Sequence, residues 1–292
     1  MDTPPTTTRS PIGAHVRTAG KGLAGYAFPH LRELGGEALQ VFVGNPRGWR
    51  PAAGNPVQDE RFRALCDEHD TPAFVHSPYL VNLGSPTEQT YLNSVATVAH
   101  NLKRGVEIGA SGVVVHTGSC VAEGTVTTAM KQVREGLLPV VEALGEDSPM
   151  LLLEPTAGQG RSLCAGVDDL RAYLDALDWH PKVGICLDTC HVFAAGAPLD
   201  APGGMTATLD RLIEVAGHGR LRLVHGNDSK DVRGAFKDRH ERVGCGHIGT
   251  TAFAELFAHP AVSGVPVLLE TPGDTAATAD DIALLKSLRD RR

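Results

Sequence analysis

The stretch MLLLE, residues 150–154, places four apolar residues directly before one carboxylate. A run this short that is apolar on both faces is typical of a parallel strand covered by helices. Seven further runs of this kind follow the same pattern: IGAHV (12–16), LQVFV (39–43), AFVHS (73–77), VVVHT (113–117), VGICLD (183–188), LRLVH (221–225) and PVLLE (266–270). Eight such runs are the number that a TIM (β/α)8 barrel requires.

The segments between these runs carry apolar residues at helical spacing, over residues 86–110, 125–144, 167–177, 251–258 and 280–288. Strands that alternate with helices predict βα units and a parallel sheet. We therefore expect an α/β fold, a TIM barrel that forms a single domain over residues 11–292 after a flexible polar tail at residues 1–10. An open doubly wound sheet is the alternative, but no GxGxxG motif follows the first run.

The composition narrows the classes of function. A chain of 292 residues suits one barrel, which typically takes about 250 residues. The formal net charge of −7 argues against sequence-independent binding of nucleic acid through bulk positive charge, although bound cations would invert the field inside a site. The polar start MDTPPTTTRSP and the lack of an 18-residue apolar stretch predict a cytoplasmic protein with no membrane partner.

Ionisable residues gather at the carboxyl ends of the predicted strands. Six of the eight runs end at or beside a histidine or an acid: His76, His116, Glu154, Asp188, His225 and Glu270. Catalytic residues of TIM barrels come from these strand ends. One such histidine alone is more often a capping or core residue, and His15, near the end of the first run, fits either interpretation. Six groups that converge on one mouth would be desolvated or repel each other unless a cation pairs with them.

The types and number of these groups predict more than one metal ion. A mixture of imidazole and carboxylate suits Zn²⁺, Mn²⁺ or Fe²⁺, and six groups exceed what a single catalytic zinc needs. Three more candidates follow: His191, in the loop LDTCHVF, and the pair Asp238 and His240, whose i, i+2 spacing in an extended segment points both side chains one way. Nine ligands suffice for three ions, and closely spaced ions favour phosphoryl chemistry.

Five longer motifs carry a family resemblance. The segments EPTAGQG (154–160), LDTCHVFAAG (187–196), HGNDSK (225–230), DRHERVGCGHIG (238–249) and LLETP (268–272) closely resemble the endonuclease IV family. Members of that family are apurinic/apyrimidinic endonucleases with a TIM barrel and a trinuclear zinc site. The resemblance extends over nearly the whole chain.

The resemblance implies three Zn²⁺ per chain, with Mn²⁺ as an alternative in some sites. It assigns His76, His116 and Glu154 to the first ion, Glu154, Asp188, His225 and Glu270 to the second, and His191, Asp238 and His240 to the third. Glu154 bridges the first two ions and is the candidate catalytic residue.

Four positions depart from the family pattern, and none is a ligand. Pro155 stands where the family often has Asn, and Gly226 replaces a common Leu. Cys120 stands where some members have His, and Cys245 where many have an acid. These changes affect residues around the substrate groove and leave the ligand set intact.

Candidate DNA contacts lie in three loops. By itself, GNPRGW (44–49), with Arg47 and Trp49, is equally well an ordinary turn, and the charged loop from Asn227 to Gly249 is more simply a solvated loop. The resemblance implies that the first of these loops enters DNA at the lesion and that the abasic nucleotide leaves the stack. Tyr79, in the loop after the run 73–77, resembles another DNA-facing residue. Beside a trinuclear zinc site, the charged loop with Lys230 and Arg239 becomes a surface for phosphate contacts.

The expected function is therefore that of a monomeric DNA-repair enzyme, a zinc-dependent deoxyribonuclease IV of the phage-T4-induced type. Its partner would be double-stranded DNA with abasic sites, cut on the 5′ side to leave 3′-hydroxyl and 5′-deoxyribose phosphate ends, and it would also trim blocked 3′ ends. A sugar isomerase or epimerase on a related barrel is one alternative, but it would leave His191 and the DRH triplet without a task. A non-catalytic binding module is the other.

Overall fold

The computed structural model describes residues 9–120 and 125–291. Within these ranges eight parallel strands close into a barrel in the order β1-β10-β7-β6-β5-β4-β3-β2, so the predicted TIM barrel is confirmed. The strands are β1 (Ile12–His15), β2 (Leu39–Val41), β3 (Ala73–His76), β4 (Gly112–His116), β5 (Met150–Glu154), β6 (Val183–Asp188), β7 (Leu221–His225) and β10 (Val267–Leu269). Most of the tail expected at residues 1–10 lies outside the described residues.

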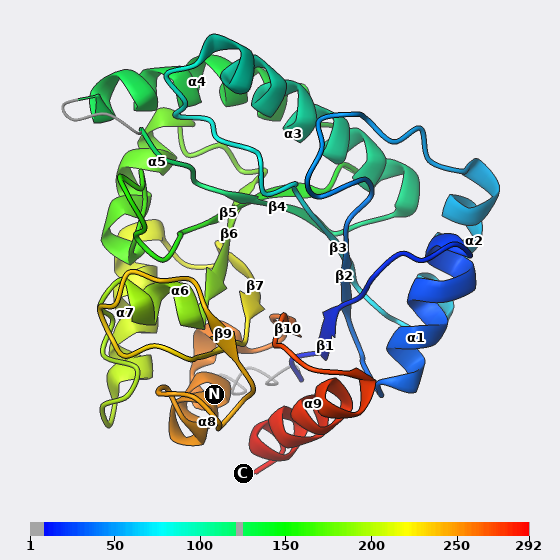
Figure 1. Ribbon diagram of the computed structural model, residues 1–292, viewed down its shortest axis with the longest axis vertical. Coiled ribbons are helices and arrows are strands. Elements are labelled where there is room, and N and C mark those ends of the chain that lie inside the picture. The colour runs from blue at the N-terminus through cyan, green and yellow to red at the C-terminus, as the bar shows by residue number, and fades with distance from the viewer. Residues whose placement is uncertain (1–8, 121–124, 292) are drawn as a thin grey trace, which may run out of the picture.

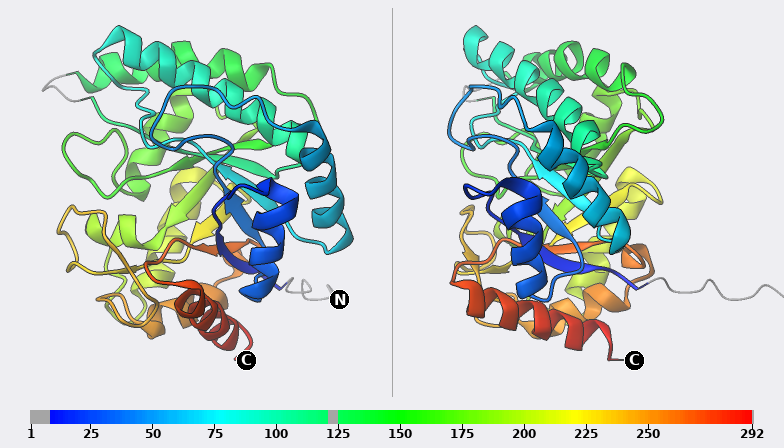
Figure 2. Two further views of the ribbon diagram at one scale, coloured as in Figure 1. Left: turned by 45° about the vertical axis from the view of Figure 1, so that its right-hand side comes forward. Right: turned by 90° about the vertical axis from the view of Figure 1, so that its right-hand side faces the viewer.

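Helices surround the ring of strands (Figure 1). They are α1 (Phe28–Glu33), α2 (Pro56–Glu68), α3 (Glu88–Ile108), α4 (Val126–Glu142), α5 (Leu170–Ala176), α6 (Thr189–Ala194), α7 (Gly204–Ala216), α8 (Thr250–Ala258) and α9 (Thr275–Arg289). A short π-helix, η1 (Leu23–Ala27), and two 3₁₀ helices, η2 (Val167–Asp169) and η3 (Pro260–Val262), accompany them. Figure 2 shows α9 along the outside of the barrel, where it contacts β1. In the part of the chain that the structure describes, no helix is both long and apolar enough to span a bilayer.

The element boundaries differ from the sequence predictions by a few residues. β5, β6 and β7 match the expected runs, whereas β2 ends at Val41, two residues early. The last helix begins at Thr275 rather than at residue 280, because the Asp274 carboxylate accepts a hydrogen bond from the Ala277 N–H at 2.9 Å and caps the new start.

The interior of the barrel is apolar toward the N-terminal ends of the strands. We call its residues the floor set: Ala38, Phe74, Val114, Leu152, Cys186, Leu223 and Leu268. All seven are buried and belong to one hydrophobic cluster. Below His15, β1 contributes Gly13, where a Cβ atom would lie 1.6 Å from the carbonyl oxygen of Ala38, so no side chain fits there.

The interior of the barrel is polar at the C-terminal ends of the strands. We call it the mouth set: Gln40, His76, His116, Glu154, Asp188, His225 and Glu270. Each member stands two residues after its floor counterpart, and because side chains alternate between the two faces of a strand, both point into the barrel. His15 holds the same place above Gly13. The strand ends therefore bring ionisable groups together above an apolar base.

The long segment after β7 covers one side of the mouth. It contains a two-stranded antiparallel ladder of β8 (Asp228–Ser229) and β9 (His240–Glu241). The buried carboxylate of Asp228 accepts four backbone hydrogen bonds at 2.8–3.2 Å, from the N–H groups of Ser229, Gly244, Ile248 and Gly249. This anchor fixes the path of the loop that carries Asp238 and His240.

Candidate metal centre

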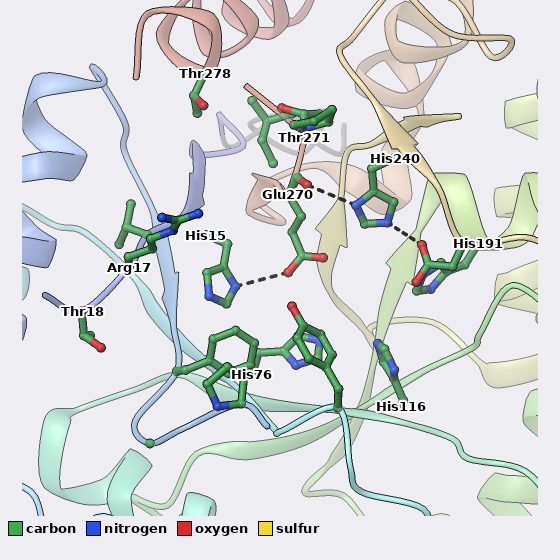
Figure 3. Close-up of a pocket in the computed structure, with 18 residues that line it drawn as sticks. His15, Arg17, Thr18, His76, His116, His191, His240, Glu270, Thr271 and Thr278 are labelled. Atoms are coloured by element: carbon green, nitrogen blue, oxygen red, sulfur yellow. Dashed lines mark hydrogen bonds and ion pairs between the residues drawn. The ribbon is translucent and has the colours of Figure 1, made fainter. Parts of the chain in front are cut away.

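The structure brings all nine predicted ligands together at the barrel mouth. Their donor atoms form three groups that lie within 4.8 Å of one another: His76, His116 and Glu154; Glu154, Asp188, His225 and Glu270; and His191, Asp238 and His240. These three groups coincide with the ligand sets that the resemblance implies. Two further groups include a buried cysteine: Glu154, Cys186 and His225; and Asp188, Cys190 and His240. Several of the predicted ligands line a common cavity of about 830 Å³ (Figure 3).

Glu154, at the end of β5, is the hub of the cluster and is fully buried. Its Oε2 atom lies 3.2 Å from Nε2 of His76 and 3.3 Å from Nε2 of His116. Its Oε1 atom lies 3.0 Å from Nδ1 of His225 and 3.3 Å from Nδ1 of His191. Oε2 therefore faces His76 and His116 of the first set and Oε1 faces His225 of the second, which is the arrangement that a carboxylate bridging two metal positions requires.

The second set surrounds His225. Its Nδ1 atom lies 3.5 Å from Oε2 of Glu270 and 3.8 Å from Oδ2 of Asp188. The buried side chain of Asn227 joins two carboxylate ligands of this set: its Nδ2 donates to Oδ2 of Asp188 at 2.7 Å, and its Oδ1 accepts from the backbone N–H of Glu270 at 2.8 Å. The amide therefore fixes the carboxylate of one ligand and the backbone of the other.

The third set combines a helix with the loop after β7. His191 lies in α6 and not in a loop as predicted, because the Asp188 carboxylate caps that helix by accepting from the His191 N–H at 3.0 Å. Asp238 lies between two imidazoles, with its Oδ2 3.2 Å from Nε2 of His191 and its Oδ1 3.1 Å from Nε2 of His240. The predicted shared orientation of Asp238 and His240 is therefore observed.

Four of the histidines have one ring nitrogen committed to an oxygen that can only accept. The pairs are Nδ1 of His76 with Ser77 O (2.7 Å), Nδ1 of His191 with Pro155 O (3.0 Å), Nδ1 of His240 with Glu270 O (3.2 Å) and Nε2 of His225 with Gln40 Oε1 (3.0 Å). In a neutral imidazole the other nitrogen then carries no proton and presents its lone pair, and here it faces a carboxylate. Such opposed acceptors need a proton or a metal ion between them, and metal-ligating histidines are oriented in this manner.

The distances also fit a metal. Two ligand atoms about 2.0–2.1 Å from a shared tetrahedral zinc lie about 3.3 Å apart. The contacts of Glu154 and Asp238 with their imidazoles span 3.0–3.3 Å. Nε2 of His240 is buried and has no hydrogen-bond partner among the described residues, although two carboxylates approach it. The donor set therefore fits borderline divalent cations.

The pKa values of the clustered histidines and acids also favour metal binding. Burial lowers the pKa of His191, but Asp188 and the other neighbouring acids outweigh burial and raise that pKa to about 10. The pKa of His240 is likewise raised, to about 9, by Asp188 and Asp238 against the effect of burial. Burial raises the pKa of Glu154, yet the imidazoles, His225 foremost, hold it well below its ordinary value. Without metal, the acids would draw protons onto the histidines, so metal binding would displace protons.

Sequence reasoning missed one member of the mouth set, Gln40. Its side chain is fully buried between His225 and Glu270, and its Nε2 also lies 2.9 Å from Nδ1 of His15. The signal in the sequence is a single polar residue inside the apolar run LQVFV, which a search of strand ends alone does not detect. His15, for which the sequence allows either interpretation, contacts Glu270 at 3.3 Å but belongs to none of the candidate metal groups among the described residues.

Of the predicted DNA contacts, Tyr79 lies beside the cluster, with its ring centroid 6.0 Å from that of His76 and 6.5 Å from that of His116. Its side chain is 58% exposed, lines the main cavity and meets the ring of Phe42 edge to face, with 5.4 Å between the centroids. Its N–H donates to the carbonyl oxygen of Pro46 at 3.1 Å, which ties it to the loop after β2. In that loop Arg47 is exposed, whereas Trp49 is half-buried and lines a separate cavity of about 240 Å³ against α3.

The remaining two predicted contacts lie on the loop after β7. Lys230 and Arg239 are exposed and are joined by a backbone hydrogen bond of 2.9 Å. The Arg239 side chain approaches Asp231, at 3.9 Å. Figure 1 shows this loop, beside β9, across the ring of strands from the loop after β2. The predicted DNA contacts therefore flank the cluster on two sides.

Two of the departures from the family pattern have a local explanation. The carbonyl oxygen of Pro155 orients His191, and that backbone group is present whatever the side chain is. A Cβ atom at Gly226 would lie 2.7 Å from Cγ1 of Val267, so this barrel has no room for the larger residue. Both departures therefore leave the ligand set undisturbed.

Comparisons with known proteins place the chain among relatives. A family model described as a xylose isomerase-like TIM barrel matches residues 28–288. A probable endonuclease 4 of Streptomyces avermitilis is 55% identical over 290 residues, which cover 99% of this chain and 93% of that protein. The crystal structure of endonuclease IV from Thermus thermophilus superimposes with a TM-score of 0.85 at 33% identity, covering 97% of this chain and 100% of that one. A D-tagatose 3-epimerase-like protein, at 17% identity, TM-score 0.73 and coverage of 94% and 96%, shares the fold alone.

Proposed function

Because this chain belongs to the endonuclease IV family, we propose that it is a zinc-dependent DNA-repair endonuclease that hydrolyses the phosphodiester bond on the 5′ side of an abasic site. The observation that carries the proposal is the convergence of three ligand groups on Glu154 and Asp238 at one cavity. Three Zn²⁺ per chain would fill these groups, with Mn²⁺ as an alternative in some. The products would carry 3′-hydroxyl and 5′-deoxyribose phosphate ends, and the same centre would trim blocked 3′ ends.

The geometry suggests a separate role for each part of the centre in this mechanism. When bound, closely spaced divalent ions activate water near neutral pH and neutralise charge on the attacked phosphate and the leaving oxygen. Glu154 holds the first two ligand sets in register, because each of its oxygens faces a different set of imidazoles. Asp238, whose side chain is 41% exposed, offers the ligand set nearest to solvent and hence to an incoming phosphate.

The substrate is proposed from the surroundings of the cavity. Tyr79 and Phe42 form an aromatic wall beside His76, which suits the sugar of an extruded nucleotide that lacks its base. Arg47, on the loop after β2, and Lys230 and Arg239, on the loop after β7, would contact phosphates on the two sides of the lesion. One chain supplies every ligand, so a monomer is sufficient for activity.

The test is incision of a duplex that holds a single abasic analogue, with and without chelator, beside an undamaged duplex of the same sequence. The proposal predicts chelator-sensitive cleavage 5′ to the lesion only, and restoration when Zn²⁺ is returned. A protein that binds zinc and leaves the lesion uncut would contradict the proposed activity. Turnover of a ketose sugar under the same conditions would instead favour the epimerase alternative.

A further inference from the structure

We propose that Gln40 is a positioning residue for the second ligand set, because its amide selects which nitrogen of His225 and which oxygen of Glu270 face the metal. The inference rests on the metal centre of the proposed function. Gln40 lies in the middle of β2 and is fully buried. It is the one member of the mouth set that carries neither an imidazole nor a carboxylate.

The contacts of Gln40 use both ends of its amide. Its Oε1 atom accepts from Nε2 of His225 at 3.0 Å, so the other nitrogen, Nδ1, is left as the lone pair. That Nδ1 atom points toward Oε1 of Glu154 at 3.0 Å and Oε2 of Glu270 at 3.5 Å, which is the metal side of the ring. The amide oxygen thereby determines the tautomer in which His225 can bind a metal.

The amide nitrogen of Gln40 acts on Glu270. Nε2 of Gln40 donates to Oε1 of Glu270 at 2.7 Å and lies 2.9 Å from Nδ1 of His15. With Oε1 held by this bond, Oε2 is the oxygen of Glu270 that turns toward His225 and the second ligand set. One donor on one carboxylate oxygen thus leaves the other oxygen free to coordinate.

Only an amide of this length performs both tasks. A carboxylate at the same place would accept from His225 but would set a second negative charge against Glu270, and an apolar side chain would do neither. Hydrogen bonds from neighbouring groups to metal ligands typically change metal affinity by about 10–100-fold. Loss of the amide should therefore weaken the second ligand set and spare the third, which Gln40 does not touch.

The experiment uses the full chain with Gln40→Met, which keeps length and volume but removes the amide, and Gln40→Asn, which retains the amide one methylene short. The matched control is Gln132→Met, because Gln132 is half-buried on α4 and its amide donates to the carbonyl oxygen of Ser85 at 3.2 Å, away from the metal centre. Zinc affinity is measured by competition with a chromophoric chelator. The visible spectrum of the Co²⁺-loaded protein reports ligand geometry, and melting of the metal-free protein reports the fold.

We expect both Gln40 variants to hold one zinc class about 10–100-fold more weakly and to show an altered Co²⁺ spectrum, while Gln132→Met matches the wild type. Wild-type zinc affinity and an unchanged spectrum in Gln40→Met would overturn the inference. So would equal weakening of every zinc class. If Gln40→Met does not fold, the same outcomes are read from Gln40→Asn. A wild-type protein that binds no zinc would instead refute the proposed function itself.

Discussion

The floor set and the mouth set occupy the same strands and the same face, two residues apart, yet they have opposite chemistry. Leu152 and Glu154 illustrate the contrast, since both are fully buried in the barrel on β5. Burying the first is favourable by itself, whereas burying an ionised carboxylate is costly unless it is paired. The floor therefore stabilises the barrel by itself, while the buried acids of the mouth must be paired with protonated histidines or with bound metal ions.

The largest expected effect comes from the hub of the mouth set. Glu154→Gln keeps the shape of the side chain but removes the charge that faces two ligand sets, so we expect incision at an abasic site to fall by about 10²–10³-fold or more. Single-turnover cleavage measures this loss. Glu142→Gln, at the exposed end of α4, is the control and should cleave normally. Near-normal incision by Glu154→Gln would refute the bridging role.

The second prediction concerns the floor. Leu152→Ala leaves a cavity in the apolar base, and we expect it to lower the free energy of unfolding by about 2–5 kcal/mol. Denaturant titration of the metal-free protein measures the change, and Leu92→Ala, at a side chain that is 51% exposed, should stay within about 0.5 kcal/mol of the wild type. The folded Leu152→Ala protein should still bind its full complement of zinc. A selective loss of zinc without loss of stability would abolish the proposed contrast.

The loop that carries the third ligand set depends on the buried carboxylate of Asp228. Asp228→Asn keeps only one acceptor oxygen for the four N–H groups that the carboxylate now receives, so we expect about 1–3 kcal/mol of local destabilisation. The ions held by Glu154 should remain while the ion at Asp238 and His240 is released first. Chelator competition and limited proteolysis of residues 226–249 measure both effects, and uniform release of all metal would contradict the expectation.

The smallest effect on activity is expected from the loop after β2, which lies outside the ligand sets. Arg47→Ala should weaken binding of abasic duplex by about 1 kcal/mol and reduce the salt dependence by about one counterion, without changing metal content. Fluorescence anisotropy over a salt series measures both quantities. Arg32→Ala, in α1 and remote from the mouth, is the matched control. An unchanged salt slope in Arg47→Ala would remove Arg47 from the DNA interface.

Much of the barrel and its cluster could be predicted from the sequence, because the decisive signals are local. Short apolar runs mark parallel strands, and an ionisable residue at a strand end must lie at the mouth once the barrel closes. Glu154 and Asp188 are predicted in this way, and both are fully buried at the ends of their strands. The family resemblance then supplies the grouping of the ligands.

The remaining features depend on contacts between distant strands. Gln40 and His225 are 185 residues apart, and nothing in the run LQVFV indicates that Gln40 contacts His225. Asn227 and Asp228 follow His225 closely, yet their roles become visible only when Asp188 and the loop to residue 249 are placed beside them. The sequence places His191 in a loop because the six residues of α6 carry too little periodicity to indicate a helix.

The nine predicted ligands at the barrel mouth are proposed to hold metal ions. The most direct measurement is the metal content per folded chain after equilibration with Zn²⁺ and removal of free ions, determined by elemental analysis against protein concentration. The proposed function predicts close to three zinc ions per chain, all removable by chelator. A folded protein that retains fewer than two would contradict it.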